Sequence, residues 1–192
     1  MAERDAGGAS IVRRVVQVGF VLALTIPGGL PARADEAQAT DRFIDFVSNG
    51  CVQALIDGAS VRTFASKALA VPAPEDFAKS FLRKETGTVF VIDDPVYPLV
   101  LAKRPDGPCT VNTKFTGNLT EMIEIVEDFF AGPGGGFYPV RTFEEEAGTL
   151  GWTTHRIYLG RRQGKKLTLL FSTTPGDDTV GQVMFAVAET KP

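Results

Sequence analysis

The 192-residue sequence predicts an α+β fold: N-terminal helices, then an antiparallel sheet of about seven strands, with helices packed on one face. Residues 109–115 alternate between apolar and polar side chains, as in a strand with one buried face. Residues 119–130 carry an apolar stripe at helical spacing, which needs such a face to pack on. Further alternating segments follow, separated by short turns, so the expected order is helices, three strands, one helix and four strands.

The N-terminus has the features of a secretory signal peptide. Arg13-Arg14 precede an apolar run from Val15 to Ile26, and Ala32-Arg33-Ala34 supplies an A-x-A cleavage site. The alternative is an uncleaved membrane anchor, but the run is too short to cross a bilayer of about 30 Å. The sequence therefore predicts that residues 1–34 are removed between Ala34 and Asp35. Residues 35–192 would remain as a single domain without stable membrane insertion.

Three helices are expected before the sheet, over residues 37–57, 61–69 and 74–84. Gly58 is positioned to end the first of them, and the proline-rich residues 71–74 separate the second from the third. The first helix has an apolar stripe in steps of three and four: Ile44, Val47, Cys51 and Leu55.

The first three strands are expected at residues 88–92, 97–103 and 109–115, where β-branched and aromatic residues are bounded by proline and glycine turns. In the third strand, one face is predicted to be buried and carries Cys109, Val111, Thr113 and Phe115. The opposite face is predicted to be exposed and carries Thr110, Asn112 and Lys114.

The helix at 119–130 places acidic residues opposite its apolar stripe, and Asn118 or Thr120 could cap it. The last four strands are expected at 137–145, 152–159, 166–173 and 179–188. Their short connections predict an antiparallel meander.

The two cysteines, Cys51 and Cys109, predict one disulfide in an exported protein. Cys51 lies on the apolar stripe of the first helix, and Cys109 begins a strand on its predicted buried face, so both point into one layer. A catalytic or metal-binding pair is the alternative. The sequence has no C-x-x-C spacing and a single histidine, His155, so a zinc site would lack ligands. No metal or cofactor is expected.

Two segments are candidate contact surfaces. Gly134, Gly135 and Gly136 belong to a loop that follows a helix and precedes a strand, the reverse of a phosphate-binding loop, so it is a linker or a mobile lid. A second turn concentrates four cations: Arg161, Arg162, Lys165 and Lys166. It lacks the Walker A spacing and is either a solvated hairpin tip or a contact for an anionic lipid or glycan.

Catalytic groups are sparse. His155 falls in a strand without a recognisable nucleophile partner, and Glu144-Glu145-Glu146 does not give the separated carboxylates of a glycosidase. Four aromatic residues could line a pocket but are more typical of core or cross-strand pairs: Tyr97, Tyr138, Trp152 and Tyr158.

The formal net charge of −3 gives no reason to expect a nucleic-acid partner. The leading hypothesis is a small, soluble, periplasmic or secreted, non-catalytic protein. It would bind a partner protein or small ligand through the free face of the sheet or the glycine-rich loop. One alternative is a periplasmic enzyme that uses His155 and a nearby carboxylate. Another is an inhibitor or immunity-type protein that uses the basic hairpin tip or an edge strand. The environment of His155 should discriminate between binding and catalysis.

Overall fold

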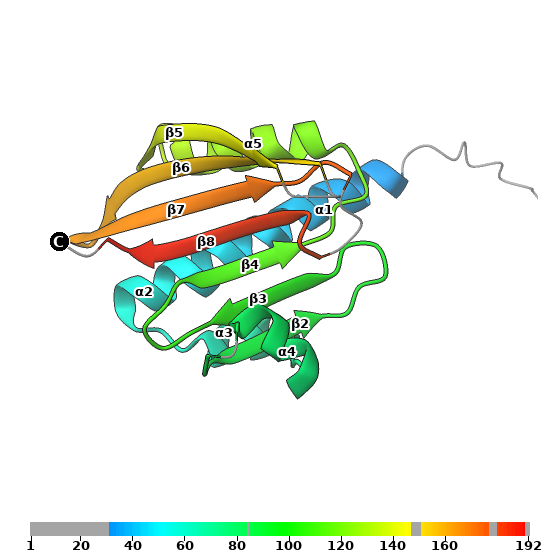
Figure 1. Ribbon diagram of the computed structural model, residues 1–192, viewed down its shortest axis with the longest axis vertical. Coiled ribbons are helices and arrows are strands. Elements are labelled where there is room, and N and C mark those ends of the chain that lie inside the picture. Colours follow the sequence, from blue (N-terminus) through cyan, green and yellow to red (C-terminus); the bar gives the residue numbers. More distant parts are fainter. Residues whose placement is uncertain (1–30, 84, 147–150, 177–179, 191–192) are drawn as a thin grey trace, which may run out of the picture.

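The computed structural model describes residues 31–83, 85–146, 151–176 and 180–190, with side chains from residue 35 onward (Figure 1). Most of the predicted signal peptide lies outside the described residues, as do Lys84 and Thr179. The predicted cleavage site after Ala34 falls within the first turns of helix α1, which begins at Pro31. Among the described residues, no helix combines the length and the apolar character needed to cross a membrane.

The N-terminal helix is continuous but changes its winding. It comprises α1 (Pro31–Asp45), a π-helical segment η1 (Phe46–Val52) and α2 (Gln53–Asp57), and Gly58 ends it with φ of 66°. The predicted Gly58 stop is therefore confirmed. Phe64 of helix α3 (Val61–Lys67) packs against Gly50, where an added Cβ would lie 2.9 Å from its ring. This close approach requires a residue without a side chain.

In the part of the chain that the structure describes, eight antiparallel strands form one sheet in the order β1-β2-β3-β4-β8-β7-β6-β5. The strands are β1 (Val71–Pro72), β2 (Thr88–Ile92), β3 (Leu99–Lys103), β4 (Cys109–Thr113), β5 (Phe137–Glu146), β6 (Trp152–Arg162), β7 (Lys165–Thr173) and β8 (Val183–Glu189). After the first meander, helix α5 (Leu119–Ala131) carries the chain to the far edge, and the second meander returns until β8 pairs with β4. The eighth strand missing from the prediction is β1, which pairs with β2 along Val71–Pro72 only.

The α+β prediction is confirmed, with one refinement to the helix layer. The main face of the sheet is covered by α1, η1, α3 and α5, and its core includes Phe43, Val111, Phe171 and Phe185. Helix α4 (Glu75–Leu82) lies on the second face, over β2 and β3, where it forms a smaller core (Figure 1). The rest of the second face, from β4 toward β5, lacks a helical cover among the described elements.

One predicted exposed position is buried. Val111 is 0% exposed on the main face, as expected, but Asn112 on the second face is only 6% exposed. Its neighbour across the ladder is Val100, which belongs to the smaller core under α4. The prediction that Asn112 faces solvent is therefore wrong, because strand alternation identifies two faces without showing that a helix approaches both.

Helix α5 is attached to the sheet by polar contacts as well as apolar ones. The Asn118 side chain caps its first turn by accepting from the Glu121 N–H, which confirms one of the two predicted caps. Glu127 accepts a hydrogen bond from the Tyr158 hydroxyl at 3.1 Å and forms an ion pair with Arg156, whose Nε lies 2.7 Å from the carboxylate. Burial raises the pKa of Tyr158, so its phenol stays protonated and remains a donor.

The predicted disulfide is confirmed. Cys51 of η1 and Cys109 of β4 are bonded across 58 positions, with 5.4 Å between their Cα atoms. Both residues are 0% exposed. The bond ties the N-terminal helix to the centre of the sheet, where η1 packs against β3, β4 and β8.

Candidate functional site

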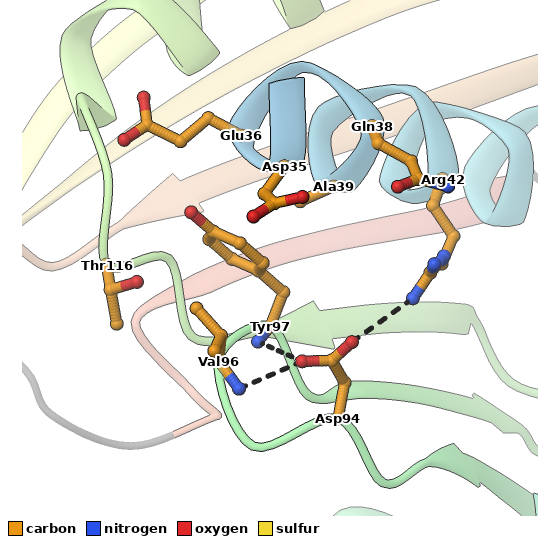
Figure 2. Close-up of a pocket in the computed structure, with 9 residues that line it drawn as sticks. All are labelled: Asp35, Glu36, Gln38, Ala39, Arg42, Asp94, Val96, Tyr97 and Thr116. Atoms are coloured by element: carbon orange, nitrogen blue, oxygen red, sulfur yellow. Dashed lines mark hydrogen bonds and ion pairs between the residues drawn. The ribbon is translucent and has the colours of Figure 1, made fainter. Parts of the chain in front are cut away.

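A pocket of about 490 Å³ lies where the start of α1 meets the loop between β2 and β3 (Figure 2). We call it the α1 pocket. Its volume is within the range of small-molecule sites. Its lining comprises Asp35, Glu36, Gln38, Ala39, Arg42, Asp94, Val96, Tyr97 and Thr116. Three of these residues carry carboxylates and one carries a guanidinium, so the charged groups have an acidic excess.

Asp94 is held in place by the turn that it forms. Its Oδ1 accepts from the backbone N–H groups of Val96 and Tyr97, both at 2.9 Å, and its Oδ2 lies 3.6 Å from Nη1 of Arg42 (Figure 2). The hydrogen bonds from Tyr97 and Val96, together with the charge of Arg42, lower the pKa of Asp94 below its ordinary 3.8. Asp94 therefore pairs with Arg42, whereas Asp35 and Glu36 have no ion-pair partner among the residues that the structure describes.

The other side of the pocket combines an aromatic ring with acids from α1. The Tyr97 side chain extends from the β2–β3 loop toward α1, and its hydroxyl is directed toward the part of α1 that carries Asp35 and Glu36 (Figure 2). The ring packs on Phe115, with centroids 5.3 Å apart. The Glu36 carboxylate also accepts from the Asn118 N–H at 3.5 Å, which links α1 to the loop before α5. A π-face beside carboxylates is suited to a cationic group.

Replacing Asp94 with asparagine tests the Asp94 turn through its pH dependence. Because the folded pKa is lowered, the charged carboxylate stabilises the protein above the unfolded pKa of about 3.9, and this contribution is lost as pH falls through the folded pKa. We expect Asp94→Asn to lower Tm by about 2 °C at pH 7, and the difference to close below pH 3.8. Thermal unfolding followed by circular dichroism measures this, with the exposed neighbour variant Asp93→Asn as the control. A pH-independent difference would contradict the assignment.

The two predicted contact segments come together in the structure. Arg162 donates to the carbonyl oxygens of Gly134 and Gly135, and its guanidinium lies 5.6 Å from the centre of the Phe137 ring. Gly135 is buried, and an added Cβ would lie 2.0 Å from the Phe130 carbonyl oxygen. Arg162 and the glycine-rich loop are therefore packed against each other where the end of α5 meets the β6–β7 hairpin.

The remaining residues of these segments divide into packed and exposed. Lys165 donates to the carbonyl oxygen of Leu55 at 2.6 Å, where it supports the end of α2. Arg161 and Lys166 are exposed and occupy opposite positions in the β6–β7 ladder. Gly134 and Gly136 are exposed in the glycine-rich loop. The charge cluster seen in the sequence therefore leaves Arg161 and Lys166 as its free cations among the described residues.

His155 lies on the second face of the sheet with the nearby carboxylate that the enzyme hypothesis requires. Its Nδ1 is hydrogen-bonded to Ser172 Oγ at 2.8 Å, its Nε2 lies 3.8 Å from Glu145 Oε2, and its ring stacks on Phe143. Ser172 is only 6% exposed, and it pairs with both flanking strands, so its neighbouring backbone N–H groups are used by the ladders. An acyl-transfer site needs an accessible nucleophile and free oxyanion donors. The geometry favours a packed histidine.

Of the four candidate pocket aromatics, only Tyr97 lines the α1 pocket. Tyr158 is in the main core, and Tyr138 and Trp152 are exposed. Sequence reasoning missed the acidic lining and Arg42, because the pocket joins the first turns of α1 to a loop far along the chain. The local signal was the Asp93-Asp94-Pro95 turn, where an aspartate commonly accepts from backbone groups that follow it.

Comparison with known proteins finds no matching family model, no matching curated protein and no matching solved structure. Among the described residues, no group of three or more histidine, cysteine, aspartate or glutamate side chains is arranged to hold a metal ion.

Proposed function

We propose that the protein is a small, exported, non-catalytic binding protein whose α1 pocket receives a cationic group. The group would belong to a small ligand or to a basic side chain of a partner protein. One observation carries the proposal: the pocket combines an aromatic ring with two carboxylates, Asp35 and Glu36, that no described cation neutralises. A protonated amine or guanidinium would pair with the carboxylates and lie against the Tyr97 ring.

Export is supported by the N-terminal sequence pattern and by the disulfide, a bond typical of oxidising compartments. Cleavage after Ala34 would also place a new α-amino group on Asp35, at the pocket itself. That group titrates near pH 7.8 and adds at most one positive charge. Three carboxylates against Arg42 and this amine still leave an acidic excess, so the preference for cations holds in the mature chain.

The binding test uses agmatine, which carries an amine and a guanidinium, and glutarate as its anionic counterpart. In titration calorimetry at low salt, we expect agmatine to bind and glutarate to show no saturable heat. Asp35→Asn should weaken agmatine binding about tenfold, because it removes one charge-assisted contact. Raising the salt concentration should weaken binding further.

The matched control is Asp41→Asn, which removes the same charge from an exposed position on α1 that does not line the pocket. Its agmatine affinity should stay within about twofold of the unsubstituted protein, because Asp41 does not contact the pocket and its exposed charge acts only through water of high dielectric constant. Equal losses in Asp35→Asn and Asp41→Asn would mean that the long-range field, and not the pocket, attracts the cation. Tighter binding of glutarate would overturn the proposal.

A further inference from the structure

The second face of the sheet contains a groove that the α1 pocket does not use. It has a volume of about 310 Å³ and lies between α4 and the uncovered strands β4, β8 and β7. We call it the α4 groove. Helix α4 lies over β2 and β3, and beside it the strands β4, β8 and β7 have no described helix on this face (Figure 1).

The sheet contributes an apolar floor to the α4 groove. Leu170, Met184 and Ala186 contribute to it, and each is half-buried. In the ladder, Ala186 stands between Leu170 on one side and Thr110 on the other. The small alanine side chain between larger neighbours leaves space that an aliphatic chain could fill.

The rim of the groove is cationic. Its described lining contains two arginines, Arg83 and Arg104, and no carboxylate. Arg104 Nη1 pairs with Glu85 at 2.9 Å, which fixes one edge of its guanidinium. Within the described parts of the chain, the Arg83 side chain has no ion-pair partner. The groove can therefore offer guanidinium donors to an anion.

The backbone at Arg83 adds an independent observation. Arg83 ends α4 with φ of 51°, a left-handed conformation that helices usually assign to glycine. A non-glycine residue is strained in this conformation, and such strain concentrates at functional positions. Asn112 also lines the groove, and its amide has one described hydrogen bond, a long one of 3.4 Å to Thr110 Oγ1. Its remaining hydrogen-bonding capacity is available to a ligand.

We propose that the α4 groove binds an apolar carboxylate. Its hydrocarbon part lies on Leu170, Met184 and Ala186, and its carboxylate is bound by Arg83 and Arg104. This chemistry is shared by a fatty acid and by the C-terminal residues of an apolar peptide. The site is separate from the α1 pocket and has the opposite charge preference.

The test is an NMR titration of the purified protein with sodium octanoate, 1-octanol, octylamine and N-acetyl-leucyl-leucine. Octanoate should shift the backbone signals of Thr110, Leu170, Met184 and Ala186 and should bind more tightly than 1-octanol and octylamine. Tighter binding of N-acetyl-leucyl-leucine than of octanoate would assign the carboxylate to a peptide terminus, and the reverse order would assign it to a fatty acid.

Two variants make the test specific. Arg83→Gly removes the guanidinium, and glycine suits the left-handed backbone, so the fold should be retained while octanoate affinity falls about tenfold. Ala186→Leu should fill the floor and abolish binding. Arg161→Gln, a charge loss at the exposed hairpin tip, is the control and should change nothing.

Equal binding of 1-octanol and octanoate, or unchanged affinity in Arg83→Gly, would overturn the proposal. Agmatine binding at the α1 pocket should be unaffected by Arg83→Gly, so the two sites succeed or fail separately.

Discussion

Replacing both Cys51 and Cys109 with serine is expected to lower the free energy of unfolding by up to about 4 kcal/mol. The disulfide closes a loop of 58 positions and restricts the unfolded chain, and both cysteines are completely buried between η1 and β4. Denaturant unfolding of the double variant measures the loss. Agmatine affinity of the folded variant should be unchanged, because neither cysteine lines the α1 pocket.

Unfolding of the unsubstituted protein with and without reductant is the control for the serine hydroxyls, which add their own burial cost. The reduced protein should lose stability in the same direction. Labelling of denatured, unreduced protein that finds two free thiols would contradict the bond.

Val111→Asp is expected to destabilise the protein by several kcal/mol or to prevent folding. Val111 is 0% exposed in the main core, opposite Leu101 and Phe185 in the ladders, and a carboxylate there would have no partner. The matched variant is Thr110→Asp, the adjacent residue of the same strand, which is half-buried at the edge of the α4 groove. It should cost less than about 1 kcal/mol.

Thermal unfolding of the two variants gives the comparison. Equal midpoints would show that the two faces of β4 are assigned wrongly. Asn112 is not a suitable control, because its side chain is also buried.

Local sequence patterns were sufficient for most elements of the fold. Alternation in residues 109–115 and helical spacing in residues 119–130 predict β4 and α5, since both patterns depend on residues close together in the chain. The disulfide followed from two such local patterns that point toward one layer. The pairing of β4 with β8 was not predictable. It joins two strands that are separated in the chain by α5, β5, β6 and β7, and no local sequence pattern marks such a pairing.

The features that the sequence did not predict depend on contacts between distant parts of the chain or on segments too short to carry a pattern. The strand β1 is only two residues long and includes Pro72, so neither alternation nor propensity marks it. The burial of Asn112 depends on α4 crossing to the second face. Arg162 and Lys165 look like surface cations in the sequence, but they donate to Gly135 and Leu55 carbonyl oxygens that only tertiary structure brings near. The acidic α1 pocket likewise joins α1 to a distant loop.

The central claim, an exported protein that binds a cationic group without transforming it, is tested most directly by native mass spectrometry of the protein purified from its own host. The account predicts a chain that begins at Asp35, carries one disulfide and retains a basic ligand or partner. That component should be released by high salt, and its retention should be weakened by Asp35→Asn but not by Asp41→Asn. Retention of residues 1–34 on membrane-bound protein, or a bound component that is acidic and insensitive to Asp35→Asn, would contradict it.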